Sequence, residues 1–543
     1  MKTIIHKYRL NKILLGIVVI LSSCLELEDT NYSTIVAEDF EPTPDDAAAI
    51  VGSGYVAWRE TMLLWNGIWR SQEVTADQIV MPARPNGWVD DGSYRRLHEH
   101  SWNPNDDQVY QGWFRTYSGI TKCNEIIYQI ETGFIPLEEE LYESTLAEIK
   151  VLRASYYYLL LDLYGNVPII TDFDVEDGYL PVQNTRQEVY DFIVDEITSN
   201  VDNLLEENNG TTYGRFNKWA AYMLLAKVYL NAEVYTGTSR WAECMTACDQ
   251  VINSGAYALE PNQKNVFVTD NENSIEIIFA LAIDEDYTTS WNQFDIHMQT
   301  LQPSMQAKYG LQFSPWGGMC AIPQFIDTFD PEDSRLTQNF IYGQQYTPAG
   351  EEIMAALGAY AGQPLNLINE VPGVDYSEAI HGYRFGKYEI APESTNILNN
   401  DYVVFRYADI LMMKAECLLR TGSADEAALL VTEVRNRSFA SNPAKATVSG
   451  ADLQEGSVYD YGLRNHLETS IEGGDDIQFG RFLDELGWEF NQEGRRRQDM
   501  IRFGAFDTKS WLSHSPNGSD RTLYPIPQTV LNDNPNLTQN PGY

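Results

Sequence analysis

Apolar side chains recur at helical spacing in several long segments of the chain, and turn residues separate these segments. The clearest is 144–164, STLAEIKVLRASYYYLLLDLY, where apolar residues return every three or four positions. Ser144 opens the segment and predicts an N-cap, since its hydroxyl can accept from free amide groups of the first turn. Gly165 and Pro168 follow, and neither readily continues a helix. The pattern therefore predicts a helix from Ser144 to Tyr164.

Two further segments share one plan. Residues 217–254 and 402–437 each read as a helix, a turn containing Gly and Ser or Thr, and a second helix. Small residues alternate with bulky ones in both, as close helix packing requires: Ala226, Ala247, Ala415 and Ala427. These segments resemble tetratricopeptide-type hairpins, although the full motif is absent. With further helices over 185–206 and 476–503, they predict a mostly α fold in which about four hairpins stack into a right-handed solenoid.

The intervening stretches lack a lasting helical period. Residues 66–116 and 260–400 are rich in Gly, Pro, Asn, Asp and Trp. Long irregular insertions on a helical scaffold usually carry binding function. The last 21 residues, LYPIPQTVLNDNPNLTQNPGY, hold too many Pro and Asn for a helix. We expect this tail to lie as extended coil across the body.

The first residues have the layout of a secretory signal. Basic residues come first, the uncharged run 13–21 follows, and Ser22 and Ser23 then precede Cys24. The run is too short for a membrane-spanning helix, which needs about 20 apolar residues. The spacing resembles a lipobox, in which Cys24 would carry the lipid of a bacterial lipoprotein after removal of residues 1–23. A simple cleaved signal with a chance cysteine is the alternative. The acidic residues after Cys24 resemble the surface-export signals of lipoproteins in the Bacteroidetes.

The chain is strongly acidic, with a formal net charge of −41. Such a surface repels phosphate backbones, so we expect no nucleic-acid partner. The acidity does not predict disorder, because 43% hydrophobic and 12% aromatic residues supply ample core. Beyond Cys24, the cysteines show no paired metal-ligand spacing, and we expect Cys244 and Cys248 to be buried core residues on one helix face.

Four stretches in this order resemble the SusD/RagB family, the outer-membrane nutrient-binding lipoproteins of the Bacteroidetes. They are EIKVLRASYYYLLLDLYGNVPII (148–170), RWAECMTACDQVINSGAYAL (240–259), FRYADILMMKAECLLRTG (405–422) and ELGWEFNQEGRRRQDMIRFG (485–504). The tail completes the set, so the likeness spans the chain.

The resemblance implies one SusD-like domain over 24–543. Within it we expect an N-terminal helical half (24–260), a loop-rich ligand-facing insertion (261–400) and a C-terminal half (401–543). It also implies a partner, a SusC-like TonB-dependent outer-membrane barrel on which the lipoprotein acts as a lid for glycan import. Neither catalysis, a cofactor nor a metal is expected.

The stretch 82–102, PARPNGWVDDGSYRRLHEHSW, is the first candidate for ligand binding. A sugar ring needs a flat aromatic platform and nearby polar groups for its hydroxyls. Trp88 would stack, Asp90 and Asp91 would accept hydrogen bonds, and Arg95 would donate. Packing of Trp88 on the helical body is the alternative.

A second candidate stretch is 312–320, QFSPWGGMC, in which Pro and Gly-Gly leave Trp316 on a loop. In related sugar-binding proteins this region lies near the first loop, so the resemblance implies that Trp316 and Cys320 face the same ligand. Tyr383 and Arg384 are further candidates, although they would equally suit a strand pair.

Two other motifs have simpler structural interpretations. His98 and His100 offer half of a metal site, but without a third ligand nearby we expect packed, hydrogen-bonded histidines. The basic run 495–497 lies in a helical segment, and we expect it to pair with carboxylates of neighbouring hairpins.

Two rival functions stay open at this point. One is a peptide-binding lid of a RagA-like transporter, in which the ligand would pair along an exposed edge. The other is a surface glycoside hydrolase that uses two carboxylates. No catalytic motif points to such a pair, but the many acidic residues leave it possible.

Overall fold

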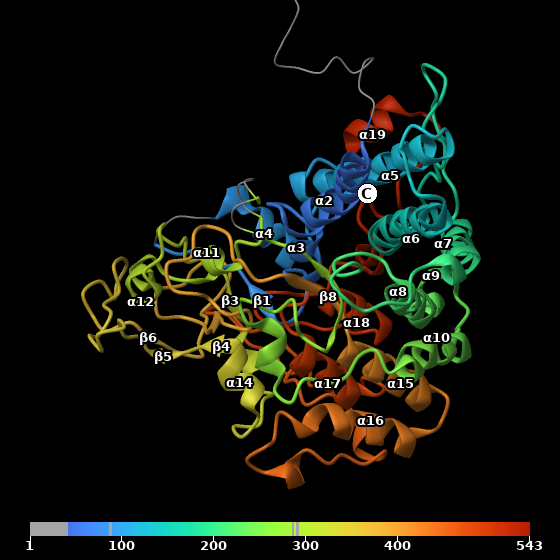
Figure 1. The fold of residues 1–543 in the computed structure, drawn as a ribbon. Coiled ribbons are helices and arrows are strands. Elements are labelled where there is room, and N and C mark those ends of the chain that lie inside the picture. Colours follow the sequence, from blue (N-terminus) through green and yellow to red (C-terminus); the bar gives the residue numbers. More distant parts are fainter. Residues whose placement is uncertain (1–41, 86–88, 285–286, 289–292) are drawn as a thin grey trace, which may run out of the picture.

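A computed structural model describes residues 42–543 apart from 86–88, 285–286 and 289–292. Helices gather on one side of the molecule, and long loops with short strands occupy the other side (Figure 1). The expected mostly α class is confirmed, while the hairpin count, the tetratricopeptide-like geometry and the division at 260 and 400 stay predictions. Within the described residues, no helix combines the length and apolarity needed to cross a membrane.

The helical side consists of long helices that each pack on a neighbour. The first group is α2 (Pro44–Leu63), α5 (Asp107–Glu131), α6 (Glu139–Leu163) and α7 (Arg186–Asn200). The second group is α8 (Lys218–Leu230), α10 (Trp241–Ser254), α15 (Tyr407–Arg420) and α16 (Ala424–Asn436), with the short α9 (Ala232–Thr236) after α8. The small residues predicted at the helix contacts are all buried, as are Cys244 and Cys248.

The starting points of two predicted helices are wrong. Helix α6 begins at Glu139, so Ser144 is not its N-cap but lies inside it. Glu139 and Glu140 stabilise the earlier start, because acidic side chains favour the positive end of a helix. Residues 402–406 form strand β8 rather than the beginning of a helix. This run is buried and continuously apolar, and periodicity alone cannot assign such a run to a helix or a strand.

The segment 476–503 contains two helices, α17 (Gly480–Phe490) and α18 (Arg496–Arg502). Between them Gln492 and Gly494 adopt positive φ values of 67° and 73°, a conformation that ends a right-handed helix. Strand β8 (Tyr402–Arg406) pairs antiparallel with β2 (Ile277–Leu281), and both strands are almost wholly buried.

The loop-rich side is built from short elements. Three two-stranded pairs occur there: β1 (Ile79–Val80) with β3 (Cys320–Ala321), β4 (Phe340–Ile341) with β7 (Arg384–Phe385), and β5 (Gly343–Gln344) with β6 (Asn366–Leu367). The short helices are α3 (Ile68–Glu73), α4 (Ser93–His98), α11 (Ile296–Thr300), α12 (Gln306–Tyr309), α13 (Pro323–Ile326) and α14 (Ser334–Asn339). The main core runs from Ala47 to Ile526, and a smaller one joins apolar residues between Leu301 and Ile380.

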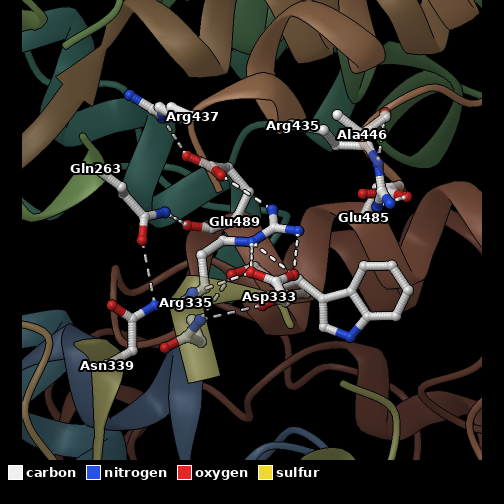
Figure 2. Close-up of polar contacts among 12 residues, drawn as sticks. Gln263, Asp333, Arg335, Asn339, Arg435, Arg437, Ala446, Glu485 and Glu489 are labelled. Carbon is white, nitrogen blue, oxygen red and sulfur yellow. Dashed lines mark hydrogen bonds and ion pairs between the residues drawn. The ribbon is translucent and has the colours of Figure 1, made fainter. Parts of the chain in front are cut away.

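A buried ion network fastens the loop-rich side to the helices. It consists of four basic and four acidic side chains: Arg335, Lys387, Arg406, Arg437, Glu276, Asp333, Glu489 and Glu493. Figure 2 shows Arg335 of α14 between Asp333 and Glu489 of α17, with N···O distances of 2.6 and 3.1 Å. The balance of charge makes burial of the network tolerable.

The C-terminal tail crosses the N-terminal helices, as predicted. The Tyr524 amide donates to Leu163 O at 2.7 Å, and Trp102 Nε1 donates to the Tyr543 hydroxyl at 2.6 Å. One part of the prediction is wrong, because the tail includes a short helix, α19 (Gln528–Asp533) (Figure 1), whose Gln528 amide donates to Pro104 O at 2.9 Å.

Candidate functional site

The first candidate stretch runs from strand β1 into helix α4 on the loop-rich side. Trp88 lies outside the described residues, and so does the Asp90 side chain. Asp91 is exposed, with a φ of 49° in a turn of 3-10 helix. The Arg95 side chain is 53% exposed and pairs with Glu99 at 2.7 Å. Asp91 and Arg95 therefore face solvent, where a ligand can reach them.

Arg84, which sequence reasoning missed, is the residue that joins the candidate stretches. Its buried guanidinium donates to Gly318 O and His381 O at 3.0 Å each, to Glu378 O, and to the Cys320 sulfur at 3.1 Å. These acceptors belong to the second candidate stretch and to the segment before Tyr383. The two candidate stretches thus meet at one side chain, together with the backbone of residues 378–381.

The buried environment of Arg84 changes the pKa of its guanidinium. Burial lowers the pKa of Arg84, while the Cys320 sulfur and Glu378 oppose that shift. Arg84 precedes the first candidate loop directly, so its hydrogen bonds hold the loop base against the second stretch. An isolated Arg framed by Pro82 and Pro85 in an acidic chain was the available sequence signal.

Trp316 is half-buried at the same place. Its amide donates to Met298 O of α11 at 2.7 Å, and Gln302 Nε2 donates to Gly317 O at 3.3 Å. A buried ion pair, Arg70–Asp295 at 2.8 Å, ties the start of α11 to α3. The indole therefore sits on a loop with a fixed backbone, as an aromatic platform requires.

Two predicted ligand contacts are wrong. Cys320 and Arg384 have no exposed surface, so neither can touch a ligand bound at the protein surface. Cys320 lies in strand β3 against Arg84, and Arg384 lies in strand β7, where Nη2 donates to Ala379 O at 2.8 Å. Burial, together with the neighbouring Arg84, lowers the pKa of Arg384 to about 9.

Tyr383, by contrast, is half-buried at the surface. Its ring stacks on Tyr342 with centroids 4.7 Å apart and an interplanar angle of 16°. Sequence reasoning missed Tyr342, although it follows the β4 residues that pair with β7.

Among the described residues, a small cavity lies at the site and a larger groove lies away from it. A water-sized cavity of about 10 Å³ lies beside Arg84 and Pro85 and is also lined by Gln302. A larger groove of about 360 Å³ lies between α2 and the start of α6, lined by small and apolar side chains such as Ala48 and Leu141. The candidate residues line neither the groove nor its rim.

The histidine prediction is confirmed, and the arginine prediction is confirmed in part, since two of the four paired carboxylates, Asp409 and Asp162, lie on neighbouring helices. His98 and His100 are fully buried, and the His100 ring stacks on Phe506 at 4.2 Å. Burial lowers the pKa of His100 to about 3, so this side chain is neutral. Among the described residues, no three His, Cys, Asp or Glu side chains are grouped to hold a metal. The run 495–497 pairs with buried carboxylates, namely Asp409, Asp499, Asp77 and Asp162.

Sequence comparison shows which known proteins this chain resembles. The sequence model of the SusD family matches residues 223–543, and a model described as starch-binding and associating with the outer membrane matches residues 50–230. Starch-binding protein SusD of Bacteroides thetaiotaomicron is 26% identical over 503 residues, covering 84% of this chain and 82% of that protein. SusD-like protein P25 of Formosa agariphila is 24% identical over 550 residues, covering 96% and 97% of the two chains.

Solved structures agree in fold. A laminarin-binding SusD-like protein superposes with a TM-score of 0.69 at 20% identity, covering 93% of this chain and all of that one. Surface glycan-binding protein A of Bacteroides thetaiotaomicron, solved with laminarihexaose, gives a TM-score of 0.66 at 18% identity, with 91% and 99% covered. With its second half matched by the family model and its fold shared along nearly its full length, the chain belongs to the SusD family.

Proposed function

We propose that this protein is a surface lipoprotein of the outer membrane, anchored through Cys24, that binds oligosaccharide and is not an enzyme. In this proposal it acts as the lid of a SusC-like TonB-dependent barrel, which imports the glycan. Family membership and the starch- and laminarin-binding relatives support the ligand class. The geometric support is the meeting of the two candidate stretches at Arg84.

The proposed binding surface consists of Trp88 and Trp316 as platforms, with Asp91 and Arg95 as polar groups. Aromatic rings bind the apolar face of a pyranose, and charged side chains bind its hydroxyls strongly. Arg84 is a positioning residue here, because its donors are already used by the protein. The function thus depends on loop residues held in place by interior hydrogen bonds.

Native affinity electrophoresis tests the proposal. The mature chain with Cys24→Ala is run through gels containing fructan, α-glucan, laminarin, xylan or mannan. We expect at least one polymer to retard the protein, and Trp88→Ala or Trp316→Ala to weaken binding about tenfold, because a lost aromatic contact costs about 1 kcal/mol or more.

The matched control is Trp219→Ala, which removes a half-buried indole from α8 on the helical side. We expect it to leave the retardation unchanged. An unretarded wild type with an intact thermal melt would overturn carbohydrate binding. Equal weakening by Trp219→Ala would show that the loop residues are not the binding surface.

A further inference from the structure

A pair of stacked tyrosines extends the β4–β7 strand pair to the surface. In the register, Phe340 lies opposite Phe385 and Ile341 opposite Arg384, so Tyr342 and Tyr383 are the next pair. Their rings are 4.7 Å apart and inclined by 16°. Tyr342 is 39% exposed, so part of this aromatic pair is open to solvent.

The tyrosine pair lies on a different face from the site at Arg84. Successive side chains of a strand point to opposite faces. Arg384 is fully buried, and the charge of Arg84 contributes to the low pKa of Arg384. Tyr383, its neighbour in sequence, therefore points the other way, toward Tyr342. A ligand on the tyrosines would not occupy the space at Arg84.

Polar groups border the tyrosines. Asp327 follows α13 and accepts from Asn369 Nδ2 at 2.7 Å. The Asn369 carbonyl oxygen is buried, so Asn369 acts here by holding the Asp327 carboxylate and not by facing a ligand. The bridge between Ile368 and His381 brings Asn369, and with it Asp327, to the Tyr383 end of β7. Burial, then Tyr342, and then the Asp327 carboxylate raise the pKa of Tyr383. An aromatic face with a carboxylate at its edge matches the two sides of a sugar ring.

The charges at this edge restrict the ligand further. Burial raises the pKa of Asp327, and the negative charge of Asp460 adds to that rise. The nearby cation, Arg464, is already bound to Asp460 at 2.5 Å. Because the Arg464 guanidinium is already paired with Asp460, the two carboxylates leave this edge negatively charged, and it repels anions. The surface suits a neutral sugar and disfavours a uronate or sulfate ester.

We propose that Tyr342 and Tyr383, with an Asp327 carboxylate held in place by Asn369, form a second carbohydrate subsite that takes a neutral pyranose ring. This inference rests on the proposed function for its ligand class, but it concerns another surface and other residues. Strand β7 would then support two sites. Its buried Arg384 lies behind the surface at Arg84, and Tyr383, the residue before Arg384, forms part of the second subsite.

The competing role of the tyrosines is purely structural, because cross-strand aromatic pairs stabilise a sheet. The test must therefore separate ligand binding from stability. The full chain, purified in detergent, is titrated calorimetrically with laminarihexaose, maltohexaose and trigalacturonate, and each variant is also melted. The variants are Tyr342→Ala, Tyr342→Trp and, as matched control, Tyr346→Ala, which removes a tyrosine that is somewhat more exposed (47%) and four positions further along the chain.

We expect Tyr342→Ala to weaken binding of a neutral hexasaccharide between about twofold and tenfold. Tyr342→Trp should keep the affinity, since it keeps an aromatic face, and Tyr346→Ala should not change it. Trigalacturonate should bind wild type more weakly than the neutral sugars. Unchanged affinity in Tyr342→Ala, with weaker binding in Trp88→Ala, would overturn the second subsite and leave the proposed function standing.

Three other outcomes also decide the matter. If Tyr342→Trp loses affinity as Tyr342→Ala does and both melt earlier, the pair is structural and the inference fails. Trigalacturonate could bind as tightly as the neutral sugars, with Tyr342→Ala reducing its affinity by the same factor. The subsite would then not select neutral rings, and that part of the inference would fail. If wild type binds neither neutral sugar, the inference fails, and failure of the polymer gels would then remove the proposed function as well.

Discussion

Replacement of Glu489 by Gln should destabilise the protein strongly, because Glu489 is the central acid of the buried ion network. It has no exposed surface and accepts hydrogen bonds from three guanidinium groups, those of Arg335, Arg406 and Arg437. The substitution keeps the size of the side chain and removes one negative charge. The network then has four basic and three acidic side chains.

The magnitude follows from that imbalance. Removing one partner of a buried ion pair costs about 3–5 kcal/mol, since the other charge stays buried without compensation. Three guanidiniums lose the negative charge that they share, and the Gln NH2 replaces one of the two accepting oxygens, so we expect the upper end, about 5 kcal/mol of unfolding free energy. Burial alone would raise the pKa of Glu489, but Arg437, Arg406 and Arg335 outweigh it and hold the pKa well below its usual range.

The sign of the pH dependence follows from this low pKa. A carboxyl whose pKa is lower in the folded state stabilises the protein above its ordinary pKa, 4.5 for Glu. That stabilisation is lost as the pH falls through the folded-state pKa. The difference between wild type and Glu489→Gln should therefore be full at pH 7 and shrink progressively below about pH 4.5.

Urea denaturation is the appropriate assay. The entropy of unfolding grows with chain length, so 1 kcal/mol shifts the melting temperature of a chain this long by only about 1 °C. Adding Arg437→Gln restores the charge balance. The loss of unfolding free energy in the double variant should be smaller than the sum of the losses in the two single variants by at least ~1 kcal/mol. Glu332→Gln, which breaks an exposed pair with Lys445, is the control and should cause no measurable change. Equal stability of Glu489→Gln and wild type at pH 7 would refute the reasoning.

Three further predictions use other parts of the molecule. Gly119→Ala in α5 should lower the free energy of unfolding by about 1–3 kcal/mol, because the new Cβ would lie 2.2 Å from the Tyr156 ring. Gly52→Ala in α2, where the new Cβ meets open space, should raise the free energy of unfolding by about 0.5–1 kcal/mol. Urea denaturation curves of the two variants and wild type measure both changes. Burial raises the pKa of Glu73 to about 7, so ionisation at higher pH opposes folding, and Glu73→Gln should be more stable than wild type by about 3 kcal/mol at pH 9 but not at pH 4. Cys24→Ala should move the protein from the outer-membrane fraction to the soluble fraction; retention in the membrane would contradict the lipid anchor.

The helical scaffold was largely predictable from the sequence, because its helices are long and their apolar spacing repeats. Residues 217–254 form helices where predicted, with Asn217 as the N-cap of α8. The errors occur where local pattern is ambiguous. The start of α6 is set by Glu139 and Glu140 as well as by apolar spacing, and the run 402–406 becomes a strand only because β2 lies beside it.

The candidate site was predictable in part. Loop composition correctly placed Asp91, Arg95 and Trp316 at or near the surface. It could not show that Cys320 and Arg384 are interior, since that depends on pairing between strands far apart in the sequence. The Arg84 contacts also span more than 200 residues, and no local pattern encodes such a contact.

The crossing of the tail over the N-terminal helices has a consequence for the order of folding. The Trp102 indole is bonded to the hydroxyl of the last residue, Tyr543, and this contact spans 441 positions. Asn540 closes a second long loop by donating to Tyr164 O at 2.9 Å. Contacts of such high contact order form late and slowly. The packing around Trp102 and Tyr164 is therefore completed only when the last residues of the chain are in place, and removal of these residues would expose both side chains.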